Sequence, residues 1–348
     1  MVGETIDEFT FLKKLGEGGM ASVYRAEDRS FKDQVAIKVL KKEYAHHPNI
    51  RKRFIDEARK LHRINHPNVI KVRRIIDAGD IVAFVMDEVK GSTLEDFINN
   101  CVNLSDELIK KLWIQMLKTV KYIHEQGIIH RDIKPSNFMI DDKDHLLLLD
   151  FGIAKDTSGS SDYTATGVSQ QMGTPTYMSP EQVRSTKDVG IQSDIYSLGV
   201  VLWFMVTKKD PYAAQKLSLF DLYEKIVKEP LPKTNSIWDN IIANTTKKSI
   251  SDRTKNCEEL LAVTNEININ DRYNEQSSTD KKNDYVQDFE KHKDGIGLRP
   301  WILTRLIFGV WIITKFGQDD EWGIPATVLG IVSILYALYS WFMPESEE

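Results

Sequence analysis

Three polar side chains with complementary chemistry lie within the stretch HRDIKPSN, at positions 130–137. Asp132 can accept a proton from a hydroxyl group, Lys134 can hold a negatively charged phosphate, and Asn137 can offer an amide oxygen to Mg²⁺. The stretch DFG follows, and its Asp150 offers a carboxylate to the same metal. These residues suit transfer of a phosphoryl group from a nucleotide to a hydroxyl, because that reaction depends mainly on positioning and charge stabilisation.

A phosphate cradle and a phosphate-binding cation occur earlier in the chain. In LGEGGMASVY, Gly16, Gly18 and Gly19 lie between two expected strands, where the missing side chains let backbone N–H groups approach phosphates. The stretch VAIK then places Lys38 on an expected strand, where its charge can meet the phosphates that are not transferred. Taken singly, both signals are weak, because most glycine clusters form tight turns and most lysines are solvated.

Five motifs in a fixed order carry a specific resemblance. GEGGMASV, VAIK, HRDIKPSN, DFG and SPE together resemble the catalytic core of the eukaryotic-like protein kinases. The lysine two residues after the aspartate and the stretch GTPTYMSPE are typical of the serine/threonine kinases, and GGM and MSPEQ are most similar to the prokaryotic branch. One departure is Ala21, which stands where the family has the third glycine of its phosphate loop.

This resemblance implies a fold and a reaction for residues 9–265. We expect an α+β, bilobal protein-kinase fold, with an antiparallel sheet and one helix in the N-lobe (9–90) and a mainly helical C-lobe (91–265). ATP would bind between the lobes together with Mg²⁺, or with Mn²⁺ in its place. The resemblance further implies that the γ-phosphoryl group is transferred to serine or threonine hydroxyls of proteins.

The resemblance also implies roles for individual residues around the nucleotide. Lys38 would form an ion pair with Glu57 and contact the first two phosphates. The adenine would lie among a gatekeeping methionine, the hinge that follows it and three apolar residues: Met86, Asp87, Val89, Val23, Ala36 and Met139. For the three apolar residues, ordinary core packing explains the sequence equally well.

Further residues would organise the C-lobe. By resemblance, Glu181 of SPE pairs with Arg253 of SDRT as a structural ion pair, and Asp194 of SDIYSLG caps the catalytic loop from a buried helix. Thr174 of GTPTYMSPE is expected where a substrate hydroxyl docks near the catalytic aspartate and lysine.

The segment DTSGSSDYTATGVSQ, between the DFG and SPE motifs, is rich in hydroxyl groups. Arg131 directly precedes Asp132, and an arginine beside a catalytic carboxylate suggests a site for an anion, which phosphorylation of this segment would supply. We expect autophosphorylation at Thr164 or Thr166, with Ser169 less favoured. The alternative is that the segment is merely flexible.

Composition excludes other classes of protein. The net charge of -5 and the isoelectric point near 6.0 provide no basic field for nucleic acid. Cys101 and Cys257 are too few for a disulfide framework or a zinc site, which favours a reducing compartment.

The C-terminal region predicts a membrane anchor. Residues 266–298 are polar and of mixed charge, as in a linker, and residues 299–343 form the expected membrane segment. Within it, 324–343 carries no charged residue and is long enough to cross a bilayer, and 301–316 is apolar with one arginine and one lysine. We expect the two stretches to form a helical hairpin through the membrane. The alternatives are a single span beside a surface helix, or a helical pair packed on the kinase.

We therefore expect an integral protein of the cell membrane whose kinase domain faces the cytoplasm, where ATP is present. Protein substrates and other copies of the chain are the expected partners, because membrane anchoring raises local concentration and favours autophosphorylation between neighbours. The competing classes are a pseudokinase that serves as a nucleotide-binding scaffold and a small-molecule kinase of similar fold. A pseudokinase usually lacks Lys38, Asp132 or Asp150, and none of them is lost here.

Overall fold

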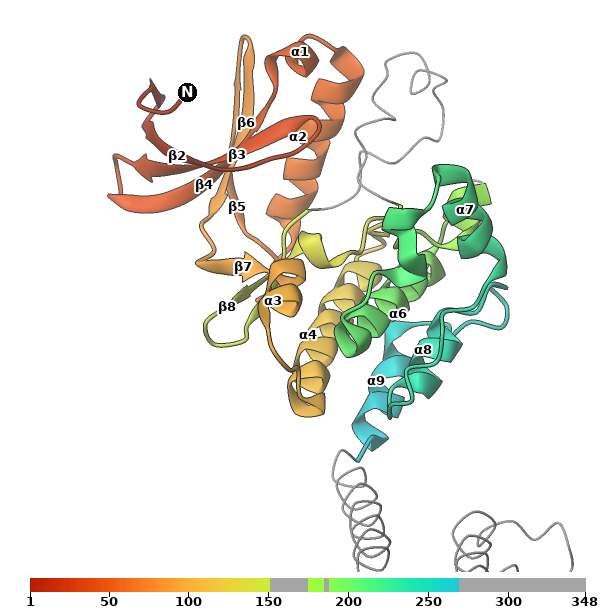
Figure 1. Cartoon of the computed structure of the whole chain (residues 1–348). Helices are drawn as coiled ribbons and strands as arrows, with labels where there is room; N and C mark the ends of the chain where they lie inside the picture. The colour runs from red at the N-terminus through yellow and green to blue at the C-terminus, as the bar shows by residue number, and fades with distance from the viewer. Residues whose placement is uncertain (151–174, 185–187, 269–348) are drawn as a thin grey trace, which may run out of the picture. The chain divides into compact units, whose positions relative to one another are not determined.

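The computed structural model describes residues 1–150, 175–184 and 188–268, which belong to one unit, Met1–Ile269 (Figure 1). The N-terminal part of this unit is an antiparallel sheet with the strand order β1-β2-β3-β4-β6-β5. The strands are β1 (Thr5–Ile6), β2 (Phe9–Glu17), β3 (Ala21–Asp28), β4 (Asp33–Leu40), β5 (Val72–Ala78) and β6 (Ile81–Asp87).

The register of β3, β4 and β6 places the expected nucleotide contacts next to one another. Val23 pairs with Lys38, and Ala36 lies between Arg25 on one side and Met86 on the other. Cross-strand partners share a face of an antiparallel sheet, so these five side chains belong to one face. The opposite face is covered by its own apolar cluster: Phe9, Phe11, Ala26, Val35, Ile37, Val39, Ile76, Ala83 and Val85.

Helix α2 (Pro48–Arg63) packs on the face of the sheet that carries Lys38. It begins with a proline, which suits the first turn of a helix, and its Phe54 ring lies 5.1 Å from that of Phe84 on β6. A second helix, α1 (Lys42–Ala45), precedes it. The N-lobe thus has one helix more than we expected, because a single turn of four residues is too short to show helical periodicity in a sequence.

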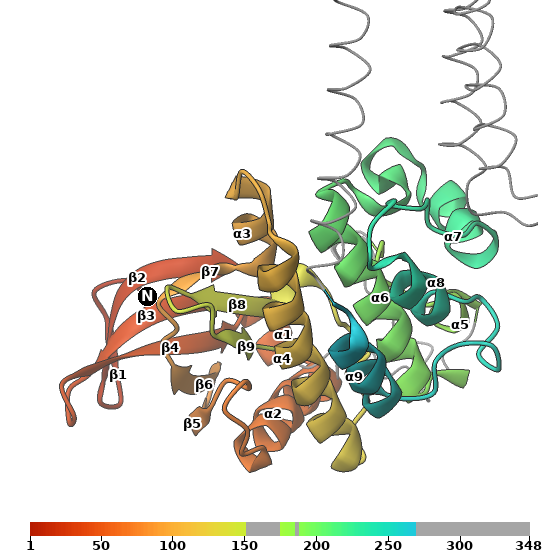
Figure 2. The same cartoon turned by 90° about the horizontal axis from the view of Figure 1, so that it is seen from below.

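Helices dominate the C-lobe, where α4, α6, α8 and α9 pack closely together (Figure 2). The α-helices are α3 (Leu94–Asn100), α4 (Asp106–Glu125), α5 (Pro180–Arg184), α6 (Ile191–Thr207), α7 (Leu219–Lys228), α8 (Asp239–Thr245) and α9 (Cys257–Glu266). Among the described residues, the 3₁₀-helices are η1 (Pro135–Asn137) and η6 (Pro211–Lys216). A small antiparallel sheet joins β7 (Gly91–Thr93), β8 (Phe138–Asp141) and β9 (Leu146–Leu148).

Helix α6 is buried on all sides, as its apolar sequence predicts. It approaches α8 closely at Gly199, where an added Cβ atom would lie 2.1 Å from Thr245 Oγ1. Only glycine permits this distance between the two helices. The polar residues of α6, Ser193, Asp194 and Ser197, are also buried, and their hydrogen bonds hold the loops around the helix.

Several expectations fall outside the described residues. These are the linker from residue 269 onward, the membrane segment 299–343 with its proposed spans, and the segment DTSGSSDYTATGVSQ with the expected phosphorylation sites. Among the helices of the described residues, none is both long and apolar enough to cross a membrane.

Candidate active site

Lys38 lies between two carboxylates that come from distant parts of the chain. Its Nζ atom is 3.0 Å from Glu57 Oε1 on α2 and 2.9 Å from Asp150 Oδ1, the first residue of DFG. The Nζ atom also lies 5.5 Å from the centre of the Phe84 ring. Glu57 is buried, whereas the Asp150 side chain is 38 % exposed and accessible to a ligand.

The surroundings of Lys38 and Glu57 shift the pKa values of both side chains. Burial raises the pKa of Glu57 to about 7, because it outweighs the lowering effect of the charge on Lys38. Burial works against the charge of Lys38 as well, but the charges of Asp150 and Glu57 outweigh it and raise the pKa of the lysine. Lys38 therefore stays protonated, and Glu57 can change its protonation near neutral pH.

The catalytic loop brings Asp132, Lys134 and Asn137 together. Lys134 Nζ lies 3.0 Å from Asp132 Oδ2, and the amide nitrogen of Asn137 donates to the same oxygen at 3.0 Å and to the Asp132 carbonyl at 2.7 Å. Residues Pro135–Asn137 form the 3₁₀ turn η1, which folds Asn137 back toward Asp132. The turn thus converts a spacing of five residues into direct contact.

Asp194 fixes the start of this loop from α6. Its carboxylate accepts hydrogen bonds from His130 N and Arg131 N, both at 2.8 Å, and it lies 2.8 Å from His124 Nε2. Arg131 has φ 65°, a left-handed conformation that is unfavourable for a residue with a side chain. Asp194, which is buried, stabilises that conformation through its hydrogen bond from Arg131 N.

The expected adenine contacts lie mainly where β4 and β6 meet the hinge. Ala36 and Met86 are buried in the main apolar cluster, and Val23 and Val89 pack against it. Met139 lies on β8 and is partly buried, but in the described part of the chain it does not belong to this cluster.

The two acids of the hinge are held by arginines, which sequence reasoning missed. Glu88 accepts a hydrogen bond from Arg25 Nε on β3 at 2.7 Å, and Asp87 accepts one from Arg73 Nε on β5 at 2.5 Å. Arg73 Nη1 also lies 2.7 Å from Asp33 Oδ2. Arg25 and Glu88 are 63 residues apart, so no local pattern could have indicated this pair.

The glycine-rich turn connects β2 to β3. Gly16 pairs with Val23, and Gly18 N donates to Ala21 O at 2.8 Å across the turn. The methyl group of Ala21 is buried in the main apolar cluster. The departure from the third family glycine therefore places a small, buried side chain on the same face of the sheet as Val23 and Lys38. Gly16, Gly18 and Gly19 remain the candidates for the cradle.

The residues available for Mg²⁺ are Asn137 and Asp150. Their segments are joined by a hydrogen bond of 2.9 Å from Leu149 N to Asn137 O. An amide oxygen and a carboxylate are hard ligands, which suit Mg²⁺ or Mn²⁺ when nucleotide phosphates and water complete the coordination. Within the described ranges, no group of three or more His, Cys, Asp or Glu residues forms a metal cluster, so a metal held entirely by such side chains has no support there.

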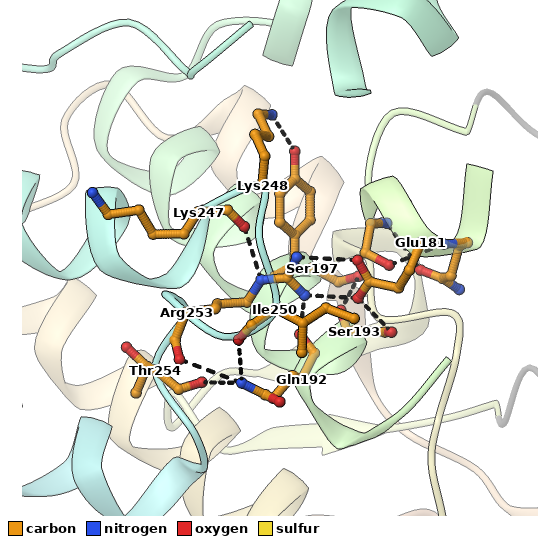
Figure 3. Close-up of polar contacts among 12 residues, drawn as sticks. Glu181, Gln192, Ser193, Ser197, Lys247, Lys248, Ile250, Arg253 and Thr254 are labelled. Carbon is orange, nitrogen blue, oxygen red and sulfur yellow. Dashed lines mark hydrogen bonds and ion pairs between the residues drawn. The ribbon is translucent and has the colours of Figure 1, made fainter. Parts of the chain in front are cut away.

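Glu181 and Arg253 form the expected ion pair (Figure 3). The contact is bidentate, with Arg253 Nη1 2.7 Å from Glu181 Oε1 and Nη2 3.0 Å from Oε2. Ser193 Oγ donates to Glu181 Oε1 at 2.7 Å, and Arg253 also donates to the carbonyls of Gln192 and Lys247. Burial tends to raise the pKa of Glu181, but the hydrogen bonds from Arg253 and Ser193 outweigh it and lower the pKa.

Four expected residues lie outside the described part of the chain. They are Thr174, which we expected near the docked substrate, and the phosphorylation candidates Thr164, Thr166 and Ser169.

Known proteins share both the sequence and the fold. The family model for the protein kinase domain matches residues 9–283. PrkC, a serine/threonine-protein kinase of Bacillus subtilis, is 32% identical over 288 residues, which cover 80% of this chain and 43% of PrkC. A probable serine/threonine-protein kinase PknB of Lactococcus lactis is 31% identical over 261 residues, covering 73% and 41% of the two chains. This chain spans less than half the length of these relatives.

The crystal structure of the Mycobacterium tuberculosis PknI kinase domain shares the fold, with a TM-score of 0.57 at 22% identity. The match covers 76% of this chain and 98% of that one. The resemblance to eukaryotic-like protein kinases and the bilobal fold that it implied are thus confirmed for this part of the sequence. The chain belongs to the protein kinase domain family.

Proposed function

We propose that this protein is an ATP-dependent protein serine/threonine kinase. The observation that carries the proposal is the joint placement of two groups: Lys38 between Glu57 and Asp150, and Asp132 in contact with both Lys134 and Asn137. A phosphate-binding cation, metal ligands and a proton acceptor are all present, which is the full set that phosphoryl transfer requires.

Each residue has a definite task in this proposal. Asp132 accepts the proton of the attacking hydroxyl, and the amide of Asn137 keeps the Asp132 carboxylate in place. Lys134, 3.0 Å from Asp132 Oδ2, stabilises negative charge on the phosphoryl group in transit. Lys38 binds the phosphates that are not transferred, and Glu57 orients it. Mg²⁺ held at Asn137 and Asp150 would neutralise charge on the phosphates.

The finer proposals follow from the sequence. Thr174 would dock the substrate hydroxyl, and Thr164 or Thr166 would receive phosphate from the enzyme itself, with Ser169 as the lesser candidate. Residues 299–343 would anchor the protein in the cell membrane with the kinase domain in the cytoplasm, and anchoring would bring copies together for mutual phosphorylation. Mn²⁺ would serve in place of Mg²⁺, because both ions accept oxygen ligands.

The first test is incorporation of labelled phosphate from Mg·ATP into casein, into small alcohols and into the full-length protein. We expect the Asp132→Asn and Lys38→Met substitutions to lower the rate by about a hundredfold or more, because each removes a group that acts on the transition state. Asp142→Asn and Lys32→Met are matched controls at exposed positions and should keep the wild-type rate.

The outcomes of this test separate the candidate functions. Labelled phosphate on the kinase itself, within the segment between DFG and SPE, supports both the reaction and the proposed autophosphorylation sites. A wild-type protein that binds Mg·ATP without transferring phosphate would be a pseudokinase, and transfer only to small alcohols would indicate a small-molecule kinase.

A further inference from the structure

Gln182, on the short helix α5, uses both ends of its side-chain amide. Its Oε1 atom accepts a hydrogen bond from Ser179 N at 3.0 Å, and its Nε2 atom donates to the carbonyl oxygen of Arg131 at 2.8 Å. The first contact is local, whereas the second crosses 51 residues to the catalytic loop. The two contacts have different purposes.

The local contact is half of a capping box. Gln182 N donates to Ser179 Oγ at 3.4 Å, and Ser179 N donates back to the Gln182 side chain. A glutamate serves this motif as well as a glutamine, because only the side-chain oxygen takes part. Capping therefore does not explain why the side chain at this position carries an amide nitrogen.

The long-range contact holds the peptide group from which the Asp132 side chain departs. Arg131 O and Asp132 N belong to one planar peptide unit, so holding one of these atoms restricts the other. Gln182 Nε2 binds the oxygen at one end, and Asp132 N donates to His130 Nδ1 at 3.2 Å at the other.

The conformation of Arg131 makes this support important. Its φ of 65° is unfavourable, and such a conformation persists only where the surroundings determine it from several sides. Asp194 of α6 holds the peptide before Arg131 through Arg131 N, and Gln182 of α5 holds the peptide after it. Neither of these side chains contacts Lys38 or Asp150 in the described structure.

We propose that Gln182 is a positioning residue, which through its Nε2 hydrogen bond to Arg131 O couples the segment 175–184 to the orientation of Asp132. The inference rests on the proposed kinase activity. Gln182 directly follows the SPE motif, and the motifs themselves give this residue no role. When segment 175–184 is in place, Asp132 is held ready to accept the proton of the substrate hydroxyl.

Gln182→Glu separates this role from capping. Glutamate has nearly the same shape and keeps an oxygen for Ser179 N, but it has no donor for Arg131 O and turns a carboxylate toward that carbonyl. Gln182→Ala removes both contacts. Gln215→Glu, at an exposed position, controls for the added negative charge.

The test measures kcat and the KM for ATP of the full-length proteins with casein as substrate, together with their melting temperatures. We expect kcat of Gln182→Glu and Gln182→Ala to fall about tenfold or more, while the KM for ATP stays within about twofold of wild type. The melting temperature of Gln182→Glu should stay close to that of wild type. Wild-type kcat in Gln182→Glu would leave only a capping role and overturn the proposal.

Hydrogen exchange gives a second readout that does not need activity. In Gln182→Glu, amides of the peptide that covers Arg131 and Asp132 should exchange faster than in wild type, whereas Gln215→Glu should match wild type. Unchanged exchange would also overturn the proposal. If the wild-type protein failed to transfer phosphate yet showed this difference, the coupling would stand and the proposed kinase activity would be the part that is wrong.

Discussion

One lysine shared by two carboxylates defines the chemistry of this site at the scale of single residues. Lys38 neutralises one of the charges of Glu57 and Asp150, and the buried Glu57 has its pKa raised to about 7. The Glu57 carboxyl group that contacts Lys38 can therefore change its protonation within the physiological pH range. The sequence predicted the pairing of Lys38 with Glu57, but burial, which sets the pKa, depends on packing between α2 and the sheet.

The raised pKa of Glu57 predicts how stability changes with pH in the absence of nucleotide. The folded protein binds this proton more tightly than the unfolded chain, where the pKa is near 4.5. The stabilisation of the folded protein by the proton on Glu57 is thus complete below pH 4.5 and is lost as the pH rises through about 7. We expect the melting temperature of wild type, relative to that of Glu57→Gln, to fall across this range.

Thermal unfolding of both proteins between pH 4.5 and 8 measures this difference. Glu107→Gln, at an exposed position on α4, is the control and should run parallel to wild type. A difference that grows as the pH rises would mean that the pKa of Glu57 is lowered rather than raised in the folded protein.

At the scale of elements, α6 organises the C-lobe from its centre. Its buried residues pack against α4 and α8, while Asp194 and Ser193 reach the catalytic loop and the Glu181–Arg253 pair. The sequence predicted a buried helix here, and the structure has it at Ile191–Thr207. The need for Gly199 could not be predicted from one sequence, because it arises from α8, more than forty residues later.

Gly199→Ala should destabilise the protein. Alanine gains about 1 kcal/mol of helix propensity, but the new Cβ atom would lie 2.1 Å from Thr245 Oγ1 and 2.9 Å from Thr246 Cγ2. Relief of such overpacking typically costs about 1–3 kcal/mol, so the loss should exceed the gain. Urea denaturation measures the change in the free energy of unfolding.

A compensating substitution tests the cause of that loss. Thr245→Ala removes the nearest atoms, so the double variant Gly199→Ala with Thr245→Ala should lose less stability than the sum of the two single variants. Additive losses would show that the contact between α6 and α8 is not responsible.

At the scale of the whole molecule, the motifs predicted the two-lobed kinase fold correctly, and the structure brings together several of the residues that the motifs singled out. Each motif brings its own local geometry, so Lys38, Asp132 and Asn137 could be assigned from the sequence. The arginines of the hinge and the Nε2 contact of Gln182 could not, because each depends on a partner brought near by tertiary packing.

The unit Met1–Ile269 also predicts where the chain can be cut. Helix α9 closes on α4 through a hydrogen bond of 3.0 Å from Trp113 Nε1 to Thr264 Oγ1, and both residues are fully buried. A fragment that ends at residue 269 should fold and keep casein phosphorylation within about twofold. A fragment that ends at Asn256 lacks α9, exposes Trp113 and should not fold.

The same fragments test the membrane proposal. The full chain should sediment with membranes, and the fragment ending at residue 269 should remain in the supernatant and autophosphorylate more slowly at equal concentration. Full-length protein in the supernatant would contradict the anchor, and an unfolded 1–269 fragment would contradict the proposed boundary.

The arginine at the hinge has a consequence for compounds that compete with adenine. Arg25 is on the same face of the sheet as Ala36 and Met86, is partly exposed, and already has its charge matched by the buried Glu88. An inhibitor with an acidic group directed at Arg25 would have to replace Glu88 as the partner of this arginine. The Glu88 carboxylate would then be buried without its cation. Selective inhibitors should instead extend a neutral hydrogen-bond acceptor toward the exposed part of the guanidinium group.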